Sequence, residues 1–306
     1  MKKLPIKLAL PDGFLEEETR EGYVVSAKMK ELWAVQLDMV AEFQRVCDAA
    51  GLKWWACGGT ILGAVRHKGY IPWDDDIDLM MMRDDYERLC EIAPKVFAHP
   101  YFWQTEATDP WSGRHHAQLR NSLTTCVLTF EVEKKYPFNQ GIFIDVFPID
   151  HIPDDEAQAD AYLKRLEVTN AAQRRVRNLT FYTRRKSVIK SLHNYILHLV
   201  KYRVPAKVYP EYKQLDDEME AAMTEFNATP CKRLLQWPAL RKPMLASDFD
   251  DTIMMPFEML QLPIPAGFEN QMVVKYGKEW RTPRQTPTAH GGLIIDAYTP
   301  YNKKDL

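Results

Sequence analysis

The sequence has few cysteines, nearly balanced charges and no long apolar run, and each of these shortages argues against a class of protein. No stretch of the 306 residues approaches 18 uninterrupted apolar residues, so no membrane-spanning helix is expected. The formal net charge is −2, so we do not expect a strongly basic nucleic-acid binder. The 46% of hydrophobic residues is enough for a sizeable core.

The cysteines are odd in number and widely spaced: Cys47, Cys57, Cys90, Cys126 and Cys231. Because they form no paired metal-binding spacing, reduced thiols in a reducing compartment are the simplest interpretation. The first residues imitate a secretory signal, but 11–13 (Pro-Asp-Gly) interrupt it before an apolar segment can form. We therefore expect no signal peptide and a cytoplasmic protein.

Composition and periodicity divide the chain into four parts. We expect an irregular lead-in at 1–25, a mixed α/β core at 26–150, a mainly helical insertion at 151–245 and a C-terminal segment at 246–306 that returns to the core. The fold class predicted is therefore α+β. Within the helical part, Asn178 and Pro205 predict breaks.

Capping and turn residues indicate where individual elements begin and end. Ser26 is a typical N-cap for a long helix that Gly51 ends. The pattern predicts short helices at 60–67 and 267–277, a helix from Arg83, and strands at 76–82, 101–105, 116–120, 125–131 and 141–147. We expect Pro148 to close the last strand.

Two adjacent glycines, Gly58 and Gly59, follow an expected strand and precede the short helix that begins at Thr60. Glycines let the backbone approach a ligand closely, and the free N–H groups at a helix N-terminus favour an anion. This turn therefore predicts a phosphate-binding site. An ordinary tight turn is the structural alternative.

Acidic residues alternate just after this helix. Asp74, Asp76 and Asp78 would share one face of the strand at 76–82 if that strand reached far enough back. Like charges repel, and a hard divalent cation is the usual compensation. The pattern predicts a metal site, and a solvent-facing acidic turn after Pro72 is the alternative.

A third acid, Asp145, stands alone in the apolar strand at 141–147. Burial of an uncompensated charge is expensive, and a metal shared with Asp76 and Asp78 would resolve that cost. Capping by backbone N–H groups would also resolve it.

Basic residues suggest further contacts. Arg66 at the end of the short helix is a candidate phosphate ligand, and Arg120 in a core strand is a candidate partner for a phosphate or an acid. The helical part carries a basic cluster, made up of Arg174, Arg175, Arg177, Arg184, Arg185, Lys186 and Lys190. This cluster has two interpretations: contact with anionic lipid or a lipid-linked acceptor, or a solvated helix surface.

These residues resemble the LicD family of phosphotransferases, which includes phosphorylcholine transferases and fukutin-type proteins. The matching segments are 59–67, 71–78 and 141–148, followed by 257–260, Pro263, 276–280, Pro283 and His290. The resemblance covers roughly 40–150 and 250–292 and implies a nucleotidyltransferase-like mixed-sheet core with flanking helices.

The resemblance also implies a site and a chemistry. Asp76, Asp78 and Asp145 would be the catalytic, metal-binding acids for Mg²⁺ or Mn²⁺, and the turn of Gly58, Gly59 and Thr60 would contact phosphate. The residue types themselves add Arg66, Arg120 and Trp73 as candidate phosphate or substrate contacts. The implied donor is a CDP-linked alcohol such as CDP-choline. The implied acceptor is a sugar hydroxyl on a cell-surface glycan or a lipid-linked precursor. The basic cluster would allow peripheral contact at the inner membrane face.

If the donor carries choline, its trimethylammonium group should lie against an aromatic face, and Trp73 is the nearest candidate. The runner-up function is a nucleotidyltransferase that moves NMP to a sugar, protein or antibiotic and releases pyrophosphate. A binding protein on a decayed transferase scaffold is a third interpretation, although its acids would not be expected to remain complete. A glycosyltransferase is the fourth, but it would not predict the glycine turn.

Overall fold

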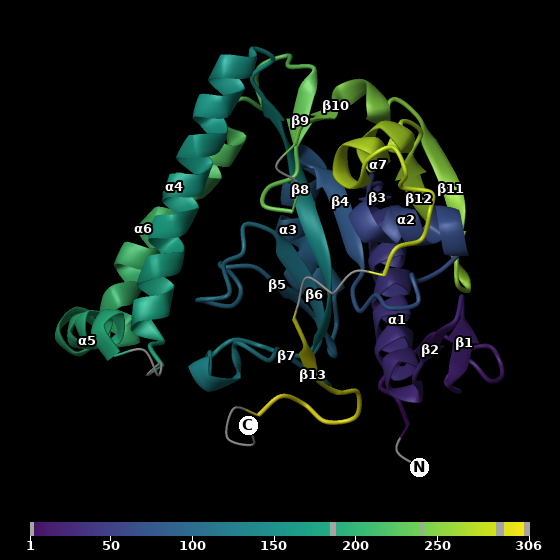
Figure 1. The fold of residues 1–306 in the computed structure, drawn as a ribbon, viewed down its shortest axis with the longest axis horizontal. Coiled ribbons are helices and arrows are strands. Elements are labelled where there is room, and N and C mark those ends of the chain that lie inside the picture. Colours follow the sequence, from purple (N-terminus) through teal and green to yellow (C-terminus); the bar gives the residue numbers. More distant parts are fainter. Residues whose placement is uncertain (1–2, 184–187, 240–241, 286–290, 303–306) are drawn as a thin grey trace.

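The computed structural model describes residues 3–183, 188–239, 242–285 and 291–302. A seven-stranded mixed sheet forms the centre, and a long helical hairpin extends to one side of it (Figure 1). Helices and strands are thus combined without regular alternation, which confirms the α+β class. The boundaries of the four expected parts stay predictions.

The sheet is built around its longest strand, β8 (Ile142–Ile152). On one side β8 pairs in parallel with β4 (Asp78–Met82), which pairs with β3 (Trp55–Ala56). On its other side β8 pairs first with β6 (Ala117–Asn121), next to β5 (Tyr101–Gln104), and later with β9 (Arg233–Leu235), next to β10 (Met244–Leu245). Only the β4–β8 pair is parallel among these described strands.

The expected end of this strand at Pro148 is wrong. Pro148 pairs only with Met81 of β4, since the β6 ladder stops at Val146 and the β9 ladder starts at Asp150. Proline has no N–H group to donate, and here one side of the strand does not require it. The strand therefore continues through the proline.

Two helices cover one face of the sheet. Helix α1 (Ala27–Ala50) and helix α3 (Arg83–Val96) both contact Trp103 of β5: Phe43 of α1 stacks on its ring and Tyr86 of α3 meets it at a tilt. Phe97, which directly follows α3, also stacks on it. The caps of α1 are confirmed, because the Ser26 side chain accepts from the backbone N–H of Met29 and Gly51 is left-handed.

The opposite face of the sheet is polar. Because side chains alternate along a strand, the register places Gln104, Gln118, Asp145 and Asp78 on the face away from Trp103. Asp78 and Asp145 therefore lie on the face that α1 and α3 leave uncovered.

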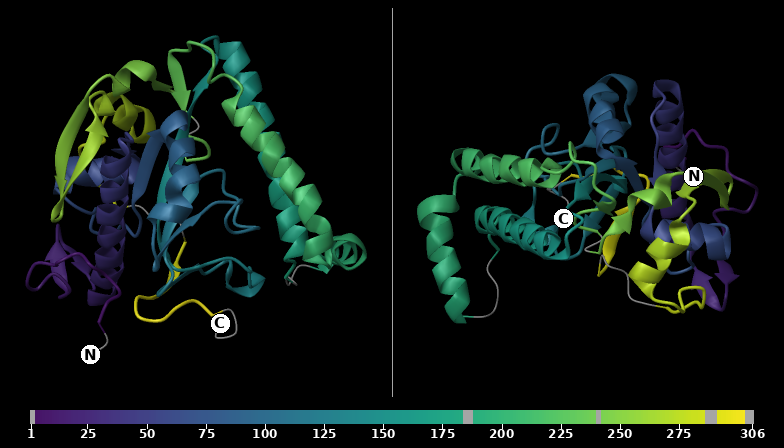
Figure 2. Two further views of the ribbon diagram at one scale, coloured as in Figure 1. Left: turned by 180° about the vertical axis from the view of Figure 1, so that it is seen from behind. Right: turned by 90° about the horizontal axis from the view of Figure 1, so that it is seen from above.

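The helical part begins with α4 (Glu156–Thr180), continues through α5 (Val188–Leu197) and a π-helical turn, η2 (His198–Tyr202), and ends with α6 (Pro205–Thr224). Breaks near Asn178 and Pro205 are confirmed. Helices α4 and α6 lie side by side, with α5 at their far end (Figure 2). In the basic cluster, Arg184, Arg185 and Lys186 and the Lys190 side chain lie outside the described residues.

The C-terminal segment forms the hairpin of β11 (Thr252–Phe257) and β12 (Leu260–Pro265), then α7 (Phe268–Tyr276), close to the expected helix. Strand β13 (Leu293–Asp296) then pairs with β7 (Thr125–Leu128). His290 lies outside the described residues.

The lead-in is not wholly irregular, because β1 (Glu18–Arg20) and β2 (Tyr23–Val25) form an antiparallel hairpin. Short 3₁₀ turns lie at η1 (Val132–Lys134) and η3 (Ala246–Phe249). Within the described ranges, no helix has both the length and the apolar character needed to cross a bilayer.

Candidate active site

The glycine turn leads directly into helix α2 (Gly58–His67), which starts two residues earlier than expected. Gly58 has a φ of +55°, and a Cβ there would lie 2.5 Å from the Lys275 Nζ atom. A Cβ on Gly59 would lie 3.0 Å from the Asp74 Oδ2 atom. Both glycines thus allow charged side chains to approach the backbone closely.

Contrary to the expectation, the acids do not all lie on one strand. Strand β4 begins only at Asp78, and Asp74 and Asp76 precede it on a loop. Helix α1 holds this loop, since Trp33 Nε1 donates to the Asp74 carbonyl at 3.0 Å and Gln36 Nε2 to the Asp75 carbonyl at 2.9 Å. Because these backbone carbonyls accept hydrogen bonds from side chains of α1, this segment does not pair with a neighbouring strand.

The loop nevertheless concentrates negative charge. Carboxylate oxygens of Asp74, Asp75 and Asp76 lie within 4.8 Å of one another. Burial, followed by the charges of Asp78 and Asp75, raises the pKa of Asp74 to about 6. None of these four acids is fully exposed, which argues against a solvent-facing turn. Crowded carboxylates of this kind fit a hard divalent cation.

Asp145 lies on the strand next to Asp78 and is its register partner. Its carboxylate is buried and accepts hydrogen bonds from Gln118 Nε2 at 2.7 Å and from His116 Nε2 at 3.1 Å. Paired residues of neighbouring strands point to the same face, so the Asp78 and Asp145 side chains share the polar face. The two side-chain donors hold the Asp145 carboxylate in place.

The Thr60 side chain forms a hydrogen bond within the core of the site. Its hydroxyl oxygen accepts a hydrogen bond from the Asp78 backbone N–H at 2.9 Å, and the side chain is buried. Thr60 therefore connects helix α2 to the start of β4. Its predicted role as a phosphate contact stays a prediction.

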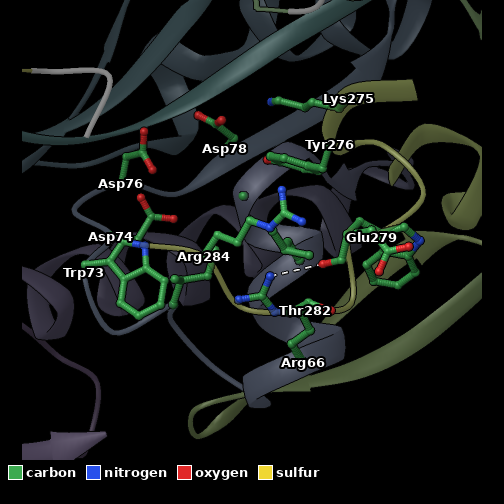
Figure 3. A pocket seen from close by; sticks show the side chains of 14 residues that line it. Arg66, Trp73, Asp74, Asp76, Asp78, Lys275, Tyr276, Glu279, Thr282 and Arg284 are labelled. Carbon is green, nitrogen blue, oxygen red and sulfur yellow. Dashed lines mark hydrogen bonds between the residues drawn. The ribbon is translucent and has the colours of Figure 1, made fainter. Parts of the chain in front are cut away.

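A cavity of about 460 Å³ unites most of the predicted residues. Figure 3 shows Trp73, Asp74, Asp76 and Asp78 on one side of it, with residues of the C-terminal segment opposite. The cavity lining comprises Gly59, Leu62, Arg66, Ile71, Trp73, Asp74, Asp76, Asp78, Lys275, Tyr276, Glu279, Trp280, Thr282 and Arg284. Asp145 lines a separate cavity of about 190 Å³.

Lys275 and Tyr276 at the end of α7 were not among the predicted site residues. Burial alone would lower the pKa of Lys275, but Tyr276 and Asp78 raise it above its ordinary value, so the amine stays charged. Tyr276 stands in the motif at 276–280 that marked the family resemblance. That motif was the available signal for this wall of the cavity.

Arg66 lines the cavity, and its predicted role as a phosphate ligand stays a prediction. Its Nη1 donates to the Trp280 carbonyl at 3.2 Å, the bond drawn in Figure 3. Its Nε is buried and has no hydrogen-bond partner among the described residues. An unsatisfied buried donor is costly, and an anionic oxygen in the cavity would satisfy it.

Arg120 is separated from the larger cavity. It is buried, and donates to Gln104 Oε1 and to the Gly141 carbonyl, each at 2.6 Å, and to Gln118. Through Gln118 it supports the position of Asp145. These contacts account for its place in the core without a phosphate.

Trp73 is half-buried at the edge of the cavity, and its ring meets Tyr23 edge-to-face at 5.9 Å between centroids. Part of its surface therefore remains available to a ligand. Its predicted contact with a cationic head group stays a prediction.

Comparison with known proteins shows the family of this chain. A family model described as the nucleotidyltransferase domain of LicD/FKTN/FKRP matches residues 51–214, more than half of the chain. The chain therefore belongs to the LicD family. The match includes the glycine turn and all the candidate acids, whereas Lys275 and Tyr276 lie beyond it.

Two relatives illustrate this membership. Over 127 residues, 42% of this chain, the sequence is 30% identical to the lipopolysaccharide cholinephosphotransferase LicD of Haemophilus influenzae and covers 46% of it. Over 40 residues, 13% of this chain, it is 50% identical to the human ribitol 5-phosphate transferase FKRP and covers 8% of it. The chain thus spans less than half the length of these curated relatives.

Proposed function

We propose that the protein transfers a phospho-alcohol group, such as phosphocholine, from a CDP-linked donor to a sugar hydroxyl of a cell-surface glycan or its precursor. The proposal is supported by membership of the LicD family and by relatives named as cholinephosphotransferase and ribitol 5-phosphate transferase. The single observation that carries it is the register pairing of Asp78 with Asp145, beside a glycine-lined acidic cavity.

Asp76, Asp78 and Asp145 would hold a Mg²⁺ or Mn²⁺ ion, and their carboxylate oxygens suit such hard cations. When bound, the ion would neutralise negative charge on the donor diphosphate. Lys275 would add a fixed positive charge from the opposite side of the same cavity. Arg66 would donate to phosphate oxygens through its unpartnered Nε.

The reaction itself is a substitution at phosphorus. The acceptor hydroxyl oxygen forms a new bond to the phosphorus of the phospho-alcohol group, and the bond from that phosphorus to the CMP oxygen breaks. The hydroxyl proton goes to a carboxylate, for which we propose Asp145, because Gln118 and His116 hold it in one orientation. CMP leaves with the released electron pair.

Variants of the acids test this proposal. Asp78→Asn and Asp145→Asn should each lower the transfer rate by about a thousandfold or more while the unfolding transition is retained. Asp217→Asn on the exposed face of α6 serves as the matched control and should keep full activity. Release of pyrophosphate in place of CMP would replace the proposal with nucleotidyl transfer.

The head group is the second part of the proposal. If it is choline, Trp73→Leu should weaken use of CDP-choline more than use of CDP-ribitol, because the cation would lose an aromatic face. Equal loss with both donors would argue against the choline contact. A cytoplasmic location with peripheral contact at the inner membrane face stays a prediction.

A further inference from the structure

Helix α5 and the turn that follows it present an apolar stripe to solvent. The stripe consists of residues spaced at i, i+3, i+4, i+7 and i+8: Leu192, Tyr195, Ile196, Leu199 and Val200. Val200 is 82% exposed and Leu192 59% exposed. An amphipathic helix of a globular protein normally turns such a stripe toward the core, so this orientation needs a reason.

The orientation is fixed by the other side of the same segment. Leu197 packs on a small core cluster that includes Tyr202, and His198 Nδ1 lies 2.8 Å from the Leu179 carbonyl oxygen of α4. These contacts hold α5 against the end of α4, with the apolar stripe outward. Figure 1 shows α5 at the far end of the helical hairpin, away from the sheet.

The sequence on both sides of this stripe is rich in basic residues. From 168 to 210 the sequence has ten lysines and arginines and no aspartate or glutamate, although the whole chain has a net charge of −2. Arg174 and Arg175 on α4 and Arg203 and Lys207 beyond the turn are exposed. An apolar face flanked by basic side chains is typical of helices that lie in the interface of an anionic membrane.

A polar cavity of about 660 Å³ lies beside the stripe, between α4 and α5. Arg174, Arg175 and Asn178 of α4 and Asn194 of α5 line it, together with one acid, Glu167. Guanidinium and amide donors suit the phosphate of a lipid headgroup. A polar cavity that suits headgroup phosphates therefore lies next to an apolar stripe that suits acyl chains. Phosphates and acyl chains are neighbours in the same way at a bilayer surface.

We propose that the α5 segment is a membrane-docking surface for an anionic phospholipid bilayer. The apolar stripe would enter the interface while the arginines of α4 contact headgroup phosphates. The charge of 168–210 favours this occupant over a second copy of the chain, because two copies would bring like charges together. The inference concerns binding alone and does not depend on the proposed reaction.

Vesicle cosedimentation of the full chain, without substrates, tests the proposal. The protein should sediment with vesicles of phosphatidylcholine and phosphatidylglycerol, and far less with phosphatidylcholine alone. Ile196→Asp should lower the partition coefficient by about tenfold or more. Ile253→Asp, at a 40% exposed position of β11 outside the basic segment, is the matched control and should bind like the wild type.

A second set of measurements tests whether vesicle binding depends on positive charge. The double variant Arg174→Gln, Arg175→Gln should bind about fivefold more weakly for each charge removed, and added salt should release the wild type. These wild-type measurements stand even if a variant fails to fold.

Three outcomes would overturn the proposal. They are no sedimentation with either vesicle, equal binding to both vesicles with no salt effect, and a wild-type dimer in light scattering that Ile196→Asp dissociates without any vesicle binding. The last outcome would make the stripe an interface between copies.

Discussion

The ammonium group of Lys275 lies where Gly58 leaves room for it: a Cβ on Gly58 would be 2.5 Å from the Lys275 Nζ. Gly58 is the first residue of helix α2 and Lys275 lies in the last turn of helix α7, so the contact joins the core to the C-terminal segment. It also brings a positive charge to the wall of the cavity that Asp78 lines. The absence of a side chain at Gly58 is therefore part of the site.

This contact predicts the effect of Gly58→Ala. The methyl group should displace Lys275, and transfer should fall by about a hundredfold, the loss typical for removal of one charge-stabilising group. The positive φ should cost about 1 kcal/mol of stability. Steady-state kinetics and urea unfolding measure the two effects.

Gly51→Ala is the matched control for this variant. Gly51 has a φ of +65°, but nothing lies within 4 Å of its added Cβ. It should lose about 1 kcal/mol of stability and keep its activity. If both variants kept full activity, Lys275 would have no role in the reaction.

Arg120 should act on stability and not on substrate binding. Arg120→Leu leaves buried oxygens of Gln104, Gln118 and Gly141 without their donor, so the free energy of unfolding should fall by about 3 kcal/mol or more. Urea denaturation measures this change. Arg88→Leu, at an exposed position of α3, should change stability little. A raised KM for the donor at unchanged stability in Arg120→Leu would restore its role as a phosphate ligand.

We expect the burial of His115 to make the stability of the fold depend on pH. Burial, followed by the charges of His116 and Arg177, lowers the pKa of His115 to about 4. Between pH 6.5 and 4 the unfolded chain binds a proton there that the folded chain does not, so stability should fall by about 3 kcal/mol as the pH is lowered through this range. Urea unfolding at several pH values measures the slope.

In His115→Gln, the fall in the free energy of unfolding between pH 6.5 and 4 that comes from His115 should disappear. His193→Gln, at an exposed position of α5, should leave this fall unchanged. An identical pH slope in His115→Gln and the wild type would show that other groups cause it.

The part of the site that depends on local pattern could be predicted from the sequence. Gly58 marks a turn, and an acid such as Asp145 within an apolar strand needs a partner wherever the strand lies. The strand start at Asp78 was harder, because it depends on hydrogen bonds from Trp33 and Gln36 of α1 to the preceding loop. Such contacts between distant segments have no periodicity.

Lys275 shows the same limit more clearly. A lysine near the end of a short helix has no special pattern, and its proximity to Gly58, more than 200 residues earlier, arises only when the C-terminal segment packs on α2. The expected strand end at Pro148 was wrong for the opposite reason: a proline ends a strand only where the neighbouring strand on its N–H side would need that donor, and the sequence does not show which side is paired.

The most direct test of the account is CMP release from a panel of CDP-alcohols, with Mg²⁺ or Mn²⁺ and a sugar acceptor, compared between the wild type and Asp78→Asn. The account predicts acceptor-dependent CMP release with one donor in the wild type and none in the variant. Equal CMP release by the folded variant, or pyrophosphate release from a nucleoside triphosphate by the wild type, would contradict it.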